Sequence, residues 1–390
     1  MTDTSRGNEG DVFGGAARAS QYIEEDTWKR PTEAPDAAES EAVEAAPAAE
    51  PLVVMPAWSS SAPVADSGAL VDSTSVLFGG TAAALTATDQ GKATTGFRGA
   101  MARLGFPVGP GPEETETRRA EAARLDAERI VRQATWTRAV SILLANPKGG
   151  SSKTPCAIIL AGVIASIRGG STAVLEVSDD PGALRHRAEG NPQLGLGELV
   201  RDIDQVTTAG RLHGYTAPQT SFADVIASTG RRSILTGEAV ASVSKVIDEF
   251  YGIRVMDSGN VVTSSAFQGA VSVTDVLVIP VMNAGDSMLE MMQLLEELRA
   301  AGGKPKRLAD NAIALRITDG RPEKQAVRDE VTRLLAVAGI TSVYEIPYDA
   351  HIAGRQQITL SELAPATRDA FVAAAAAVVT SLKNSVSTEH

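Results

Sequence analysis

Hydrophobic and polar positions follow a regular order only in the later part of the chain. From about residue 137, short runs rich in Val, Ile and Leu alternate with longer amphipathic stretches. Short, continuously apolar runs are typical of strands buried on both faces of a parallel sheet. The pattern predicts strands at 139–145, 172–177, 252–256, 276–281, 312–317 and 343–346, and helices at 154–168, 237–250, 286–301, 323–338 and 366–383.

Strands that are separated by helices predict right-handed crossovers between parallel strands. We therefore expect an α/β fold, a three-layer sandwich around a twisted, mainly parallel sheet. A further helix is predicted at 113–133, because acidic residues fill its first turn while Arg129 and Arg132 lie near its end, as the helix dipole favours. Its apolar face is weak, so we expect it to lean on the domain that follows.

The first 90 residues have a different composition. They carry 15 acidic and 4 basic side chains, whereas residues 91–390 carry 33 and 32. Their Pro, Ala and Glu content leaves too little apolar surface to offset chain entropy, so we expect disorder. The expected organisation is a disordered acidic Pro/Ala-rich tail at 1–90, a linker and lead-in helix at 91–136, and a catalytic-type domain at 137–390.

Composition excludes several classes of protein. A single cysteine, Cys156, excludes a disulfide framework and a Cys-rich zinc site, and the four histidines lack metal-ligand spacing. A net charge of −12 argues against a chain that coats nucleic acid by bulk charge. Because neither an apolar run of about 18 residues nor a secretory signal is evident, we expect no transmembrane helix and a cytoplasmic location.

The segment 146–154, NPKGGSSKT, joins the first predicted strand to the helix after it. Glycines let a backbone turn tightly enough for N–H groups to face an anion, and the new helix adds its positive end. Lys153 would reach the β- and γ-phosphates, and the hydroxyl of Thr154 would hold Mg²⁺. The residues expected to contact the nucleotide here are Lys148, Gly149, Gly150, Ser151, Ser152, Lys153 and Thr154.

This segment departs from the phosphate-loop pattern G-x-x-x-x-G-K-[ST] at two positions. Pro147 stands at the first glycine and Ser152 at the second, where a side chain fits only with negative or strained φ. On that pattern alone, nucleotide binding stays an open question. However, the additional Lys148 makes the string KGGSSKT resemble the deviant Walker A motif of the ParA/MinD family of P-loop ATPases.

The resemblance continues at the ends of later strands and covers roughly residues 137–383. Residues 176–182, EVSDDPG, are similar to the family's switch I segment, and 254–260, RVMDSGN, to its Walker B strand and switch II. Asp257 matches the aspartate that holds the Mg²⁺ shell. Residues 346–349, IPYD, resemble the loop that passes near the adenine, which implies nucleotide contacts from Pro347 and Asp349.

The resemblance implies ATP and Mg²⁺ as cofactors and an ATP-dependent homodimer. Lys148 would reach across the dimer to the partner's nucleotide and stabilise the charge that spreads during phosphoryl transfer. Asp180 is the first candidate for orienting the attacking water and Glu176 the second, because two alignments of switch I are open. Both carboxylates can also be read as turn residues at the surface.

The implied function is an ATPase that positions or partitions a cargo such as plasmid or chromosomal DNA, with weak ATP hydrolysis. An activating partner or cargo adaptor would bind it, in one reading through the tail. A basic loop at 302–307 is the candidate for non-specific DNA contacts. Direct membrane binding is not expected, because the C-terminal SLKNSVSTEH lacks a basic amphipathic helix.

Three other readings stay open. The Pro/Ala-rich N-terminal region suits an accessory MinD-like ATPase of a secretion or conjugation system. The serine at 152 and the irregular switch I favour a weakly hydrolysing nucleotide-binding adaptor. The third is a metabolic, ligase-like relative of the same superfamily, against which the tail and the lack of a substrate constellation argue.

Overall fold

A computed structural model of the protein describes residues 91–388, and the tail expected at 1–90 lies outside the described residues. Its strands are β1 Val140–Leu144, β2 Thr172–Val177, β3 Ala217–Pro218, β4 Ala223–Ile226, β5 Ile253–Ser258, β6 Val276–Met282, β7 Ile313–Ile317 and β8 Ser342–Ile346. Its helices are α3 Gly96–Arg103, α4 Pro112–Gln133, α5 Lys153–Arg168, α6 Leu184–Arg187, α7 Leu196–Arg201, α8 Ala209–His213, α9 Gly237–Phe250, α10 Ser265–Ser272, α11 Gly285–Ala301, α12 Gly303–Asp310, α13 Gln325–Val337, α14 Ala350–Ala353 and α15 Pro365–Thr388.

The strands of the described residues form one 8-stranded sheet in the order β3-β4-β2-β5-β1-β6-β7-β8. Neighbouring strands are parallel, except that β3 is antiparallel to β4. All six predicted strands are present. The sequence pattern missed β3 and β4, because β3 has only 2 residues and β4 includes Asp224 within 4 residues, so neither forms a long apolar run.

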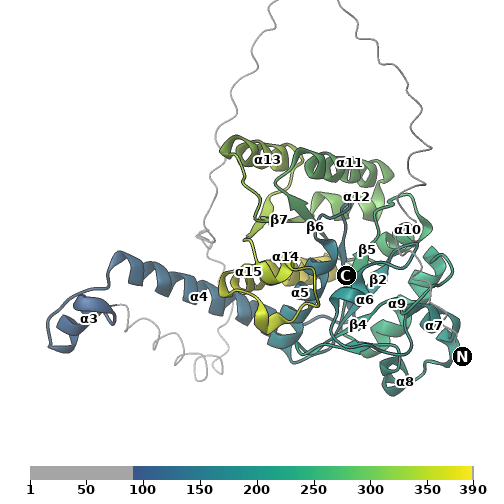
Figure 1. The fold of residues 1–390 in the computed structure, drawn as a ribbon, viewed down its shortest axis with the longest axis horizontal. Helices are drawn as coiled ribbons and strands as arrows, with labels where there is room; N and C mark the ends of the chain where they lie inside the picture. Colours follow the sequence, from purple (N-terminus) through teal and green to yellow (C-terminus); the bar gives the residue numbers. More distant parts are fainter. Residues whose placement is uncertain (1–90, 389–390) are drawn as a thin grey trace, which may run out of the picture. The chain divides into compact units, whose positions relative to one another are not determined.

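Helices cover both faces of the sheet, which confirms the three-layer α/β sandwich (Figure 1). Along β1, Ile142 and Leu144 belong to the core shared with α5 and α15, whereas Leu143 belongs to the core shared with α9, α10 and α11. Successive side chains of a strand point to opposite faces, so one apolar run supplies both cores.

Helix α5 occupies the centre of one of these cores. Apart from its first residue, its buried positions are small or apolar, from Cys156 to Ala165, and they cover every side of the helix. A helix that is apolar all round has to be buried in a core. It is packed against β2, β5, α4 and α15, so the loop that precedes it is attached to a rigid element.

The helix predicted at 113–133 is α4, and it leans on the domain as expected. Ala127 and Val131 are buried, and the helix packs against α15 and α5. At its C-terminal end, Arg168 of α5 donates hydrogen bonds to the carbonyl oxygens of Val131 (2.7 Å) and Ala134 (2.9 Å). The same guanidinium lies 4.6 Å from the ring centre of Trp136, a cation–π contact that fixes the entry to β1.

Helix α15 passes a simple test for a membrane span, which differs from the expectation of none. Residues Pro365–Ser387 are long and apolar enough by length and composition alone. However, Phe371, Val378 and Leu382 are completely buried against the sheet and α5. The apolar composition of α15 is therefore that of a helix in the core of this sandwich.

The contact between α9 and α10 depends on two glycines, and it generates a prediction. A Cβ added to Gly269 would lie 2.5 Å from the Cα of Gly237, so the two backbones touch. Gly269→Ala should lower the free energy of unfolding by about 1–3 kcal/mol, because the helices must move apart. Gly210→Ala is the control, since an added Cβ there meets nothing within 4 Å. Urea denaturation of both variants tests this, and equal effects would contradict the close contact.

Candidate functional site

The loop between β1 and α5 is a tight turn that contains two residues in the left-handed region. Gly150 and Ser152 both have positive φ, 79° and 68°, and Ser152 is the residue before α5 begins. For serine, this left-handed conformation costs about 1–2 kcal/mol relative to glycine. Ser152 therefore stands at the glycine position with a strained, positive φ, which is one of the two conformations that the sequence allowed.

Asn146 fastens this loop to the sheet, and sequence reasoning gave it no role. Its buried side chain donates from Nδ2 to the carbonyl oxygen of Pro280 in β6 (2.9 Å). Its Oδ1 accepts from the backbone N–H of Lys148 (3.0 Å). The sequence did contain a signal for this role, a polar residue directly after an apolar strand. An amide buried at that position needs hydrogen-bond partners on several sides.

Lys153 lies inside the loop rather than in solvent. Its Nζ donates to the carbonyl oxygens of Asn146 (2.6 Å) and Lys148 (3.2 Å) and to Oδ1 of Asn260 (2.6 Å). Burial lowers the pKa of Lys153 to about 8, and the charge of Asp257 opposes part of that shift. Asn260 follows β5, so the end of that strand is held directly to the loop.

Thr154 and Asp257 form the centre of the site. The Thr154 hydroxyl donates to Oδ2 of Asp257 (2.6 Å), while Oδ1 of Asp257 is buried without a hydrogen-bond partner among the described residues. Burial is the main cause that raises the pKa of Asp257 to about 7. A hydroxyl beside a buried carboxylate with an unused oxygen fits the hard, oxygen-preferring Mg²⁺ ion.

The described residues contain no group of three or more His, Cys, Asp or Glu side chains that could hold a metal by themselves. A single carboxylate and a hydroxyl can hold Mg²⁺ only where waters and phosphate oxygens complete the shell. The hydroxyl of Ser151, in the same loop, is also buried without a partner in the described residues. These two unsatisfied atoms, Oγ of Ser151 and Oδ1 of Asp257, lie on the loop and beside it.

The two switch I candidates have different environments. Glu176 is buried next to Asp257 on the paired strand, and its carboxylate accepts hydrogen bonds from the backbone N–H groups of Gly182 (2.9 Å) and Ser228 (3.1 Å). It is also ion-paired with the buried Arg232 at 3.2 Å. Asp180 is exposed in the turn beyond the strand. Glu176 therefore holds the segment after β2 together, and of these two carboxylates only that of Asp180 is open to solvent.

Arg232 was missed by the sequence reading. Besides Glu176, its guanidinium donates to the carbonyl oxygen of Ser178 (2.7 Å) and the hydroxyl of Ser228 (2.8 Å). It ties the segment after β4 to the segment after β2. Because β4 itself was not predicted, no signal in the sequence placed this arginine near the site.

The two residues expected near the adenine lie after β8. Asp349 is buried, and its carboxylate accepts from the backbone N–H groups of His351 (2.9 Å) and Ala364 (2.9 Å), so it caps α14 and fixes the loop. Pro347 is partly buried. Between them, Tyr348 is 48% exposed, and its ring covers Gly320, where an added Cβ would lie 2.5 Å from the ring.

Lys148 points away from the interior of the loop. Its Nζ lies 2.8 Å from Oδ2 of Asp286 in the first turn of α11, and both side chains are substantially exposed. The hydrogen bond to Asp286 raises the pKa of Lys148. The structure thus brings Thr154 into direct contact with Asp257, places the charge of Lys153 near that carboxylate, and leaves Lys148 at the surface beside them.

Neither a protein-family model nor a curated protein sequence matches this chain. Solved structures similar to it include an ATP complex of McdA from Cyanothece, 16% identical over 61% of this chain and 96% of that one, with a TM-score of 0.45. A ParA family ATPase from Chlorobium tepidum is 14% identical in sequence over 64% of this chain and 96% of that one, with a TM-score of 0.47. The MinC:MinD cell division protein complex from Aquifex aeolicus is 16% identical over 60% of this chain and 94% of that one, also with a TM-score of 0.47. At identities this low the similarity concerns the fold alone, and the site rests on this chain's own residues.

The raised pKa of Asp257 generates a prediction about stability without nucleotide or Mg²⁺. The folded protein holds the proton of Asp257 more tightly than the unfolded chain, so its stability falls as pH rises from about 4 to about 7. Asp257→Asn replaces the titrating carboxylate with a neutral amide, so the variant does not lose stability in this way as pH rises. The variant should exceed the unmodified protein in unfolding free energy by up to about 4 kcal/mol at pH 7.5, and by only about 1.5 kcal/mol at pH 5.

Denaturation at the two pH values measures this difference. Asp286→Asn is the control, because the hydrogen bond from Lys148 lowers the pKa of Asp286 and keeps it ionised over this range. If the effect of Asp257→Asn were the same at pH 5 and pH 7.5, its carboxylate would not be the titrating group.

Proposed function

We propose that this protein is a ParA/MinD-like ATPase that binds ATP with Mg²⁺ and dimerises with it. The observation that carries the proposal is the contact of Thr154 with Asp257 (2.6 Å), beside Lys153 and beneath a loop with positive φ at Gly150 and Ser152. A lysine, a hydroxyl and a carboxylate at the end of a parallel strand are the groups that phosphate and Mg²⁺ require.

Each residue has a separate task in this proposal. Backbone N–H groups of 149–153 and the start of α5 bind the phosphates, and Lys153 exchanges its loop carbonyl partners for phosphate oxygens. Thr154 and Asp257 would hold Mg²⁺, which neutralises charge on the β- and γ-phosphates when bound. Pro347 and the loop fixed by Asp349 would lie along the adenine.

Lys148 would act on the nucleotide of a second subunit. Its ion pair with Asp286 is exposed, and pairs of this kind contribute only about 0–1 kcal/mol, so the lysine is easily released. In the dimer it would contact phosphate oxygens, a charge-assisted contact of about 1.5–3 kcal/mol. The change of partner is therefore favourable, and ATP would link the two subunits.

Hydrolysis is expected to be slow. The buried Glu176 is already engaged by two backbone N–H groups and Arg232, so it is not available to orient water without breaking these bonds. That role falls to the exposed Asp180. The same observation favours a second candidate function, a nucleotide-binding adaptor that hydrolyses weakly, and steady-state turnover separates the two.

The cargo and setting are further parts of the proposal. DNA binding would rest on the basic residues of α12 rather than on Arg316 or Arg328. Arg316 is buried, and both of these arginines are ion-paired with Glu345. Within α12, Lys306 is paired with Asp310, which reduces the charge available to DNA. We propose a cytoplasmic protein whose cargo or activating partner is recruited by residues 1–90, with 137–390 as the ATPase domain.

Nucleotide binding is tested by thermal denaturation with and without millimolar MgATP. A ligand that binds only the folded state stabilises it by mass action, about 2.7 kcal/mol at 100 times the Kd, so the midpoint should rise by a few degrees. Lys153→Ala should abolish the rise, whereas Lys245→Ala, an exposed lysine of α9, should keep it. No rise in the unmodified protein would refute the nucleotide site.

The two lysines should have separable effects on assembly. With a non-hydrolysable ATP analogue, light scattering should detect dimers of the unmodified protein, and Lys148→Ala should weaken dimerisation about 10- to 100-fold while preserving nucleotide binding. Lys153→Ala should lose both. Asp286→Ala is the matched control, because it breaks the same ion pair but leaves the lysine, and it should dimerise at least as well.

If the unmodified protein stayed monomeric with bound analogue, or if Lys148→Ala dimerised normally, the shared-nucleotide dimer would be wrong. A monomer that still binds nucleotide would then support the adaptor function.

A further inference from the structure

The side chain of Asn260 spans part of the loop between β1 and α5. Its Oδ1 accepts a hydrogen bond from Nζ of Lys153 at 2.6 Å. Its Nδ2 lies close to Gly149, because a Cβ added to that glycine would be 3.7 Å from it. Asn260 comes two residues after the end of β5, so a side chain from another strand covers the turn that is proposed to bind phosphate.

The hydrogen bonds of Lys153 make phosphate binding a competition. A lysine ammonium group has three N–H donors. Nζ of Lys153 donates to the carbonyl oxygens of Asn146 and Lys148 and to Oδ1 of Asn260, so all three donors have acceptors within the protein. A phosphate oxygen can therefore bind this lysine only by taking the place of at least one of them.

Asn260 is the acceptor that is easiest to displace. The other two acceptors are backbone carbonyls of the loop, which the side chain of Asn146 fastens to Pro280 in β6. Asn260 is exposed and can turn away by rotation about its own side-chain bonds. Within the described part of the chain, the backbone N–H groups of 260–263 donate to no backbone carbonyl oxygen, so this segment is weakly held.

The residue before Asn260 supplies a fixed point from which the amide can move. The backbone N–H of Gly259 donates to the carbonyl oxygen of Val177 at the end of β2. A Cβ added to Gly259 would lie 3.2 Å from Cβ of Ser178, so the backbone passes close to that serine. The segment after β5 is thus held at 259 and becomes loose from 260 onward.

We infer that Asn260 is a latch that closes the phosphate loop by competing with phosphate oxygens for Lys153. A nucleotide triphosphate displaces the amide, and the lysine then exchanges its carbonyl partners as well. Because only the loop with the latch open can bind, the apparent affinity is reduced by the fraction of molecules that are open. Asn260 is a positioning residue that acts through Lys153, and the inference rests on the proposed function, to which it adds regulation of the same site.

Calorimetric titration of the full chain with a non-hydrolysable ATP analogue and Mg²⁺ tests the sign of the effect. Asn260→Ala removes the acceptor and should bind the analogue at least threefold more tightly than the unmodified protein. Asn260→Ser, which is polar but too short to reach Nζ, should change affinity in the same direction. An asparagine that contacts the nucleotide would give weaker binding in both variants. Weaker or unchanged binding overturns the latch.

The matched control is another exposed asparagine that is bonded to a cationic side chain. Oδ1 of Asn191 accepts from Nη2 of Arg185 at 2.6 Å, and neither residue belongs to the phosphate loop. Asn191→Ala should change affinity for the analogue less than twofold. Equal tightening in Asn191→Ala and Asn260→Ala would mean that the effect does not arise at the loop, and it would overturn the latch.

Stopped-flow measurements with a fluorescent N-methylanthraniloyl ATP and Mg²⁺ separate a latch from a structural role. Loss of a ligand contact acts mostly on the dissociation rate constant, whereas a latch acts before the ligand is bound. Asn260→Ala should therefore raise the association rate constant at least threefold and change the dissociation rate constant less than twofold. A gain in affinity that came only from slower dissociation would overturn the latch.

The latch and the nucleotide site fail in different ways. If neither the unmodified protein nor Asn260→Ala binds the analogue, the proposed nucleotide site is wrong and the latch is wrong with it. If both bind with equal affinity, the nucleotide site stands and only the latch is overturned. Binding by Asn260→Ala alone would support both. A loss of cooperative thermal unfolding in Asn260→Ala and Asn260→Ser would mean that Asn260 maintains the fold, which also overturns the latch.

Discussion

The parallel pairing of β1 with β5 is the constraint on which the proposed nucleotide site depends. Its register sets Leu144 opposite Asp257, so the last residue of one strand lies beside the carboxylate at the end of the other. The chain then turns from β1 into α5, and Thr154 in the first turn reaches Asp257 at 2.6 Å. A shift of one residue would turn Asp257 to the other face of the sheet and break this contact.

The site retains groups that would be unfavourable elsewhere in the core. Burial lowers the pKa of Lys153 to about 8 and raises that of Asp257 to about 7, so both charges are destabilised before any ligand binds. Ser152 adds backbone strain. Phosphate and Mg²⁺ would relieve these penalties, because each supplies the opposite charge and ligand atoms that the protein lacks. In the proposed function, the instability of these groups in the free protein would therefore be coupled to nucleotide affinity.

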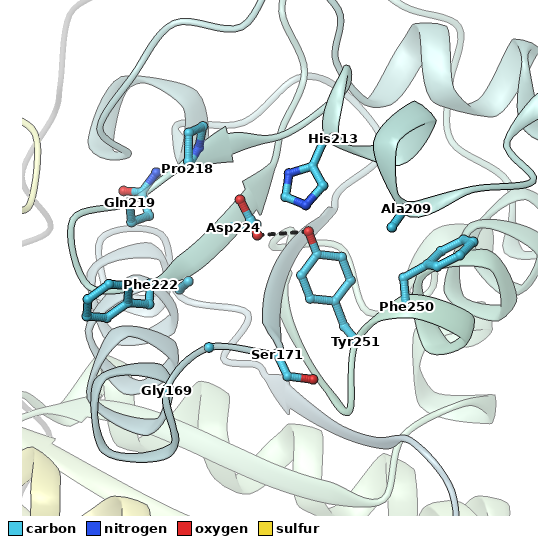
Figure 2. A pocket seen from close by; sticks show the side chains of 12 residues that line it. Gly169, Ser171, Ala209, His213, Pro218, Gln219, Phe222, Asp224, Phe250 and Tyr251 are labelled. Carbon is cyan, nitrogen blue, oxygen red and sulfur yellow. Dashed lines mark hydrogen bonds between the residues drawn. The ribbon is translucent and has the colours of Figure 1, made fainter.

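The two edges of the sheet have different chemical characters. The carboxyl edge carries the glycine loop, lysines and a buried carboxylate, whereas the amino edge carries Asp224, which accepts a hydrogen bond from the hydroxyl of Tyr251 (Figure 2). Helix α5 begins at Lys153 at the carboxyl edge and ends at Arg168, close before β2 begins at the amino edge, so one buried helix runs from one edge to the other.

The sequence by itself determined the six main strands, the long helices α4, α5, α9, α11, α13 and α15, and the position of the glycine loop, because these depend on local patterns: continuous apolar runs, helical periodicity and the KGGSSKT string. The shorter helices, such as α10 and α12, carry too few residues to show such a pattern. The short strands β3 and β4, the Glu176–Arg232 ion pair and the anchoring of the loop by Asn146 were decided by tertiary structure alone. The ion pair and the anchor each join residues far apart in the chain through a buried polar contact, and β4 is held by its pairing with the distant β2. Which distant donor meets which acceptor follows from the register of the strands, and no local pattern in the sequence carries that information.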